Sequence, residues 1–178
     1  HARDFGRAGA VHVQRNGVGP LGGVDDDMAD TVDDTGEKLA VGMCCQLVRF
    51  HVIPRSEKGK ILTEMTATRL GEDEFLMMTG AGAYWHDRDL LNFNLQADGS
   101  VTVKDITSDL ATLLVTGPKA PSLMADLAGK AMGHEAFPWL TWRQMEIGGV
   151  KVNAIRVSFA GEAGWELHCD MADITALY

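Results

Sequence analysis

Glu162 lies between two glycines in the stretch Gly161–Gly164, and a carboxylate on a tight turn can bind a ligand. Glycine adopts positive φ angles and allows close backbone approach, both of which a ligand-binding loop needs. Apolar residues on either side predict two strands joined by this loop, at residues 150–159 and 165–168. An ordinary hairpin loop explains the same pattern. The loop alone therefore leaves both interpretations open.

Two adjacent pairs carry groups that perform acid–base or nucleophilic chemistry elsewhere, His86-Asp87 and His168-Cys169. We expect neither pair to act as a dyad. Neighbouring helix positions point apart, and successive residues of a strand face opposite ways. The pattern favours capping or surface packing for His86 and Asp87.

Strands and helices that could position these residues are recognisable from about residue 60 onward. The expected strands lie at residues 60–70, 75–78, 101–103, 113–115, 145–147, 150–159 and 165–168, and the expected helices at 84–95, 121–131 and from 171. A unit of hairpin, glycine loop and helix occurs twice, at residues 60–95 and 145–178. Hairpins with interspersed helices predict an α+β fold, with mixed or antiparallel sheet lobes and packed helices.

Residues 1–57 remain unassigned. Gly17, Gly19 and Gly22 match a bare dinucleotide-binding pattern, but Pro20 removes a backbone N–H from the phosphate cradle. An acidic run from residue 25 follows, without the glycine and ligand alternation of a calcium loop. Residues 44–50 predict a strand. A disordered stretch and a misjoined stretch are both open interpretations of this segment.

Composition limits the classes of function. The chain has 178 residues, 46% of them hydrophobic, which predicts one domain, or one domain and a piece of another. Its net charge of -9 argues against a nucleic-acid partner. The sequence contains neither an apolar run of membrane-spanning length nor a signal peptide. Three cysteines without a metal-ligand spacing predict a reducing compartment and no metal site. We expect a cytoplasmic protein, or one of the mitochondrial matrix if eukaryotic, and a chain that is a fragment.

Five local strings follow the order and spacing of one protein family. They are residues 59–70, residues 79–82 with His86-Asp87, residues 108–109 leading to 116–118, residues 136–138, and residues 158–167. Together they resemble the glycine cleavage T-protein (aminomethyltransferase) group, whose folate-binding domain also forms the C-terminal part of dimethylglycine and sarcosine dehydrogenases. The resemblance covers residues 58–178, which it identifies as a partial folate-binding domain of a three-lobed α+β protein.

The resemblance implies roles for four residues. Glu162 matches the glutamate that holds the pterin, and a carboxylate suits the two adjacent N–H donors of that ring. Glu64 falls where the family usually has aspartate near the folate nitrogens, and it becomes the candidate catalytic acid. The strand pattern alone predicts a solvent-facing Glu64 instead. Tyr84 is a candidate for stacking on the ligand, although core packing is the more frequent role. Phe159 is the fourth candidate, at a position where tyrosine is common in the T-protein branch.

The resemblance also implies a function and its alternatives. The leading hypothesis is a tetrahydrofolate-binding one-carbon transfer domain of an FAD-linked dimethylglycine or sarcosine dehydrogenase-type enzyme, with the flavin domain outside this chain. Its donor would be a methylamine or amino acid. One alternative is a stand-alone aminomethyltransferase with a lipoyl carrier protein as partner, and another is a non-catalytic folate-binding or scaffold domain. We expect weak or no activity from residues 1–178 in isolation.

Overall fold

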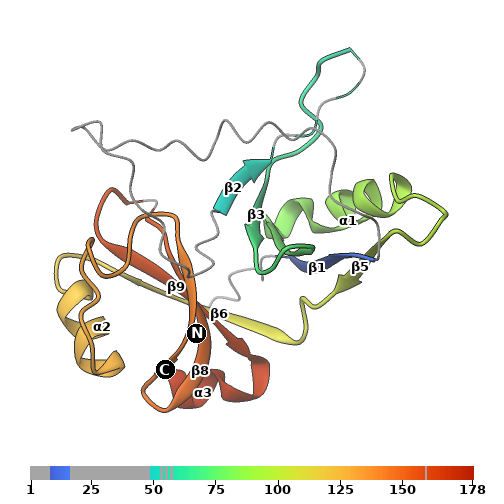
Figure 1. Ribbon diagram of the computed structural model, residues 1–178. Helices are drawn as coiled ribbons and strands as arrows, with labels where there is room; N and C mark the ends of the chain where they lie inside the picture. The colour runs from blue at the N-terminus through green and yellow to red at the C-terminus, as the bar shows by residue number, and fades with distance from the viewer. Residues whose placement is uncertain (1–8, 17–48, 53, 55, 57, 159) are drawn as a thin grey trace, which may run out of the picture.

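The computed structural model describes residues 9–16, 49–52, 54, 56, 58–158 and 160–178. Two antiparallel sheets lie side by side, with short helices packed on them (Figure 1). The first contains β1 (Gly9–Arg15), β2 (Arg49–Val52), β3 (Met65–Arg69), β4 (Glu74–Thr79) and β5 (Val101–Asp105). The second contains β6 (Leu110–Thr116), β7 (Trp142–Ile147), β8 (Val150–Arg156) and β9 (Gly164–Asp170). The predicted α+β class is confirmed, with antiparallel sheets.

The strands of the first sheet follow the order β2-β3-β4-β1-β5. β1 is therefore an interior strand, with Gly9 opposite Thr79 on one side and Val11 opposite Asp105 on the other. Both β1 and β2 come from the segment that the sequence leaves unassigned. Residues 9–15 and 49–52 are thus part of the sheet, which corrects that interpretation for these two stretches. The glycine pattern at residues 17–22 and the acidic run lie outside the described residues.

β3 starts at Met65, later than the predicted start at residue 60. The reason is a local turn, because the N–H of Leu62 donates to the carbonyl of Pro54 at 2.9 Å and the N–H of Gly59 donates to Ser56 at 2.8 Å. These bonds fold the segment back on itself before the strand begins. Glu64 is consequently the residue that directly precedes β3, instead of lying within it.

Helix α1 (Tyr84–Phe93) follows β4 through the short 3-10 helix η2 (Ala81–Ala83). Its inner side packs on the first sheet, where Leu91 lines a small cavity together with Met65 and Met77. The helix is the one predicted at residues 84–95, and its outer side leaves Phe93 90% exposed. Within the described ranges, the structure has no helix of the length and apolar character that crossing a membrane requires.

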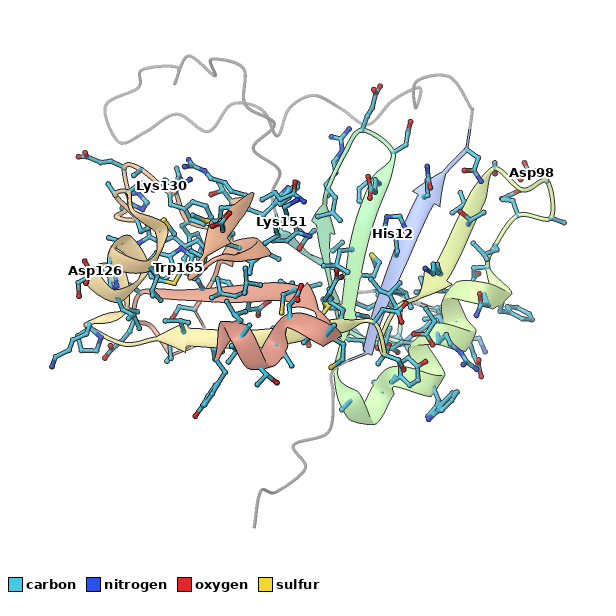
Figure 2. All side chains as sticks on the ribbon, turned by 90° about the horizontal axis from the view of Figure 1, so that it is seen from below. His12, Asp98, Asp126, Lys130, Lys151 and Trp165 are labelled. Atoms are coloured by element: carbon cyan, nitrogen blue, oxygen red, sulfur yellow. The ribbon has the colours of Figure 1, made fainter. Side chains whose placement is uncertain are left out.

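The second sheet has the order β6-β9-β8-β7, and its core lies on the side covered by α2 (Ala120–Ala128). Figure 2 shows Trp165 on this side of the sheet, beside α2. Trp165 is 0% exposed, and Met124 of α2 and Phe137 of the following loop are buried with it. Gly129 ends α2 in the left-handed conformation, at a φ of 62°, so the helix stops at Ala128, three residues before its predicted end at 131.

The β7–β8 hairpin joins the strands predicted at residues 145–147 and 150–159, and it turns at Gly148-Gly149. Their φ angles are 58° and 87°, and two positive values in a two-residue loop match the right-handed twist of the flanking strands. β8 then ends at Arg156, before the predicted end at 159. The expected strand at 165–168 is β9, which extends to Gly164 and Asp170.

The predicted repeat of hairpin, glycine loop and helix is met only in part, because the glycine loop at residues 161–164 leads into β9 and not into a helix. β4, η2 and α1 follow one another in the same way as β9, the 3-10 helix η3 (Met171–Asp173) and α3 (Ile174–Leu177). The residues that join strand to 3-10 helix have nearly identical angles, φ -64° and ψ 142° at Gly80 and φ -59° and ψ 142° at Asp170. The same backbone path therefore leads from a strand into a helix in both sheets.

Gly164 offers a test of how tightly the second sheet is packed. A Cβ at this position would lie 2.7 Å from the carbonyl oxygen of Val157, which is backbone and cannot rotate away. We expect Gly164→Ala to destabilise the protein by about 1–3 kcal/mol, measured as a lower Tm of the complete protein. Gly82→Ala is the matched control, because a Cβ there meets nothing within 4 Å. Equal Tm values for the two variants would contradict this packing.

Candidate functional site

The Glu162 loop joins β8 to β9 and lies against the turn that follows β6. Gly161 has a φ of 76°, so the predicted need for glycine at this turn is met. The N–H of Gly117 donates to the carbonyl of Ala163 at 3.1 Å, which ties the loop to that turn. A Cβ at Gly117 would lie 3.9 Å from Oε2 of Glu162, so the carboxylate sits beside this glycine. Glu162 itself is exposed.

Glu64 directly precedes β3 of the other sheet, and it is also exposed. Its neighbour Met65 at the start of β3 pairs with Thr79 of β4, and the Thr79 hydroxyl donates a hydrogen bond to the Asp87 carboxylate on α1. The start of β3 is thus linked by a side chain to the helix that follows β4. The structure places Glu64 and Glu162 each at the entrance to a strand, β3 for one and β9 for the other.

Asp87 is the most buried acid of the first sheet's half, at 1% exposure. Thr79 Oγ1 donates a hydrogen bond to Oδ2, and His86 Nδ1 lies 2.9 Å from Oδ1. Burial alone would raise the pKa of Asp87, but the hydrogen bonds from Thr63, Thr79 and His86 hold this pKa below its ordinary value. The expectation that His86 and Asp87 point apart is wrong. Although they are adjacent on the helix, the Asp87 side chain turns inward and the exposed imidazole reaches it.

Tyr84 lies at the start of α1, where three contacts hold it. Its hydroxyl donates a hydrogen bond to Asp105 of β5, and a Cβ added to Gly9 of β1 would collide with its ring. The Arg88 guanidinium lies 5.9 Å from the centre of that ring and 4.4 Å from the centre of the Trp85 ring. Tyr84 is thus engaged in packing, while the neighbouring Trp85 is 64% exposed. Phe159 lies outside the described residues.

Sequence reasoning missed a buried polar pair on β9. Glu166 is 8% and His168 1% exposed, and His168 Nε2 lies 3.2 Å from Glu166 Oε2. Nδ1 of the same ring lies 2.9 Å from Thr112 Oγ1. Because a carboxylate accepts, the consistent tautomer has Nε2–H donating to Glu166 and the Thr112 hydroxyl donating to Nδ1. The signal was present in the sequence as two polar residues two apart within a strand.

Cys169 faces away from His168, as predicted. It belongs to the apolar core with Trp165 and Leu167, while Glu166 and His168 occupy the opposite face of β9. Burial raises the pKa of the Cys169 thiol, and the charges of Asp173 and Asp170 raise it further. A thiol with a raised pKa is a poor nucleophile. Among the described residues, no three histidine, cysteine or acidic side chains are grouped so as to hold a metal ion.

The family described as the GCVT N-terminal domain matches residues 38–178. The chain belongs to this family. The resemblance to the aminomethyltransferase group is therefore confirmed, and the match begins before residue 58, where the local strings begin. Human mitochondrial dimethylglycine dehydrogenase is 34% identical over 122 residues, which are 68% of this chain and 14% of the relative. Sarcosine oxidase subunit alpha of Corynebacterium sp. (strain P-1) is 31% identical over 135 residues, 73% of this chain and 13% of the relative.

A solved structure shows the same fold. The glycine cleavage system aminomethyltransferase T from Bartonella henselae superposes with a TM-score of 0.66 at 20% sequence identity, over 97% of this chain and 42% of that protein. The chain spans about one seventh of the length of these two curated relatives. Membership in this family of transferases and demethylating dehydrogenases is established, as predicted.

The lowered pKa of Asp87 predicts how stability changes with pH. Because the folded-state pKa lies below the unfolded one, the bonded carboxylate stabilises the fold at pH values above about 4 and loses this effect as the pH falls through the folded value. We expect the stability advantage of wild type over Asp87→Asn to be full near neutral pH and to shrink below about pH 4.

Urea unfolding of the complete protein at several pH values measures this difference. Asp89→Asn controls for the change of charge on α1, since the Asp89 carboxylate is 73% exposed. An advantage that stays constant down to about pH 2 would show that Asp87 is not held as a carboxylate.

Proposed function

We propose that this chain is the tetrahydrofolate-binding part of an enzyme that moves a one-carbon unit from a methylamine-type donor to the folate. The observation that carries the proposal is the glycine-flanked Glu162 loop, fixed beside Gly117 in a chain of this family. Tetrahydrofolate supplies the nitrogens that accept the one-carbon unit. The residues of this chain bind it, orient it and stabilise charge.

The pterin ring fits the donor set of this stretch. Its amino group and neighbouring ring N–H are donors, and a carboxylate accepts both at once. Glu162 presents its carboxylate beside Gly117. Four residues on, Glu166 is a second carboxylate, and its burial favours a stronger hydrogen bond. We assign the pterin to Glu162 and treat Glu166 as the alternative holder.

Glu64 is proposed as the catalytic acid. An exposed carboxylate at the entrance to β3 can stabilise positive charge on a reacting amine and accept or return its proton. For Tyr84 the contacts support a smaller role, because its hydroxyl is already bonded to Asp105 and only the ring remains for a ligand. Phe159 is proposed as a neighbour of the pterin from its place in the Glu162 loop.

Among the branches of the family, the dehydrogenase branch is the better supported. The 34% identity is to a dimethylglycine dehydrogenase, so we propose a methylated amino acid as donor and an FAD-containing domain elsewhere in the complete protein. That relative is mitochondrial, which supports the matrix if the source is eukaryotic. A stand-alone aminomethyltransferase served by a lipoyl carrier protein is the second candidate, favoured by the fold of the Bartonella protein. A scaffold domain without turnover is the third.

Glu162→Gln tests the pterin assignment. Loss of a charged acceptor should weaken binding of folinic acid, a stable reduced folate, by about 10- to 150-fold, which corresponds to about 1.5–3 kcal/mol. Calorimetric titration of the complete protein measures the Kd. Glu146→Gln on β7 is the matched control, because Glu146 is an exposed glutamate of the same sheet.

Glu166→Gln, titrated in parallel, separates the two candidate carboxylates. A loss of affinity confined to Glu166→Gln would move the assignment to the buried residue. Unchanged affinity in both variants would refute folate binding through this stretch.

Glu64→Gln tests the catalytic assignment. We expect turnover to fall by about 100-fold or more, as is usual for loss of a general acid–base group, while the Kd for folinic acid changes little. Formation of methylene-folate from dimethylglycine by the complete protein is the measurement. Glu72→Gln, at the far end of the same hairpin, serves as the control. Normal turnover in Glu64→Gln would remove this residue from the mechanism.

A further inference from the structure

Thr112, His168 and Glu166 form a hydrogen-bonded chain on the polar face of the second sheet. Thr112 Oγ1 lies 2.9 Å from Nδ1 of His168, and Nε2 of the same ring lies 3.2 Å from Oε2 of Glu166. Thr112 is opposite His168 in the pairing of β6 with β9, so the strand register brings these two side chains together. A hydroxyl, an imidazole and a carboxylate bonded in this order are the groups that activate an oxygen nucleophile.

Burial gives the three groups different roles. The side chain of His168 is 0% exposed and that of Glu166 is 11% exposed, whereas Thr112 is an exposed residue. Because the carboxylate accepts the Nε2–H, the lone pair of the neutral ring lies on Nδ1 and faces the hydroxyl. The imidazole is therefore held in one tautomer, and the oxygen beside it is reachable from solvent. A base held in this way can accept the hydroxyl proton as the oxygen attacks an electrophile.

The edge of the second sheet supplies a backbone donor beside this hydroxyl. The N–H of Gly117 donates to Ala163 at 3.1 Å, and the N–H of Met171 donates to Asp109 at 2.8 Å. In an antiparallel pair, residues bonded in this way alternate with residues whose N–H and C=O point away from the partner strand. Thr112 is an odd number of positions from both Asp109 and Gly117, so its own N–H points away from β9. β6 is the first strand in the order β6-β9-β8-β7, so this N–H lies at the sheet edge, where it can bind an oxyanion.

A cavity of about 500 Å³ adjoins the chain of hydrogen bonds. His168 lines it, and so does Leu110, which lies on the same face of β6 as Thr112. Its volume is within the roughly 300–1,000 Å³ of small-molecule sites. The other polar residues that line it are Gln144, Lys151, Asn153, Asp170 and Asp173. Both signs of charge are present, so the lining suits an uncharged molecule that carries polar atoms.

We propose that Thr112 is a nucleophile for small activated esters, with His168 as its general base and Glu166 as the residue that positions the imidazole. Thr112 Oγ1 attacks the carbonyl carbon of the ester, and the bond from that carbon to the leaving oxygen breaks. Nδ1 of His168 accepts the hydroxyl proton and passes it to the leaving group. Water then attacks the acyl-threonine, and His168 transfers a proton from this water to Oγ1 as the carboxylic acid leaves. The activity goes beyond the proposed folate chemistry and uses none of its reactants.

p-Nitrophenyl acetate tests the proposal on the complete protein, without folate. We expect p-nitrophenolate to be released with an initial burst, and a peptide map of acid-quenched protein to show an acetyl group on Thr112. Thr112→Val should lower the rate above the spontaneous reaction by roughly 100-fold or more, because the nucleophile is lost while the shape of the side chain is kept. Thr112→Ser should keep the activity, since serine retains the hydroxyl.

Thr116→Val is the matched control. Thr116 is an exposed threonine on the same face of β6, and its hydroxyl donates to the carbonyl of Ala163 at 3.4 Å instead of to an imidazole. We expect the wild-type rate from this variant. Glu166→Gln tests the positioning role, and we expect kcat for the ester to fall by roughly 100-fold or more with little change in KM, because the imidazole loses the charged acceptor that fixes its tautomer.

The ester activity and the folate function can fail separately. Equal rates in wild type and Thr112→Val would overturn the ester activity, and so would acetyl groups found on lysine or histidine side chains but not on Thr112. A kcat in Glu166→Gln equal to that of wild type would overturn the positioning role. If the complete protein binds no folinic acid, the folate function fails, while a burst that depends on Thr112 still supports the ester activity.

Discussion

Burial of β9 on both faces is the constraint on which the second sheet depends. Every residue from Gly164 to Cys169 is buried, with Trp165 at 0% exposure on one face and His168 at 1% on the other. The apolar face is stabilised by packing against α2, and the polar face by the bonds of His168 to Glu166 and Thr112. A strand held in this way cannot slip in register without exposing Trp165 or burying unpaired charge. The Glu162 loop therefore enters a fixed strand.

In the first sheet, a different interaction fixes the start of the strand β3. Near the start of β3 the packing is thinner, since Ile61 is 60% and Leu62 is 40% exposed. The buried Asp87 carboxylate is hydrogen-bonded to Thr79 of β4 and His86 of α1, and Thr79 pairs with Met65 at the start of β3, which connects this entrance to α1. Hydrogen bonds to a charged group are stronger and more directional than apolar contacts, so they suit a position where orientation matters more than buried area. The strand β9 is therefore held in place largely by packing, whereas the start of β3 is held by the hydrogen bonds of a buried carboxylate.

The helices and strands were predicted from local sequence signals. The features that the sequence did not reveal depend on contacts between residues far apart in the chain. Gly148-Gly149 specifies a tight hairpin by its own φ angles, and the apolar spacing near residue 84 specifies a helix without reference to the rest of the chain. β1 was not predicted because it is defined by partners at least 60 residues away, with Gly9 opposite Thr79 and Gln14 opposite Glu74. The contact between His86 and Asp87 was mispredicted because it follows from the burial of Asp87 beneath Thr79. The sequence did not single out Glu166 and His168, because these two polar residues stand out only when both side chains are known to be buried.

Both candidate acids share one arrangement, which explains why neighbouring residues matter as much as the acids themselves. Glu64 directly precedes β3 and Glu162 lies two residues before β9, and both side chains are exposed. A side chain at a strand entrance has a backbone fixed by the sheet and still reaches solvent, where a ligand binds. Precision at such a site comes from the supporting contacts, since a loop residue without them is displaced easily. For Glu162 these contacts are the Gly117 turn and the Ala163 carbonyl, and for Glu64 they are the pairing of Met65 with Thr79 and the bond from Thr79 to Asp87. The chemistry of each acid thus depends on a neighbour that never meets the ligand.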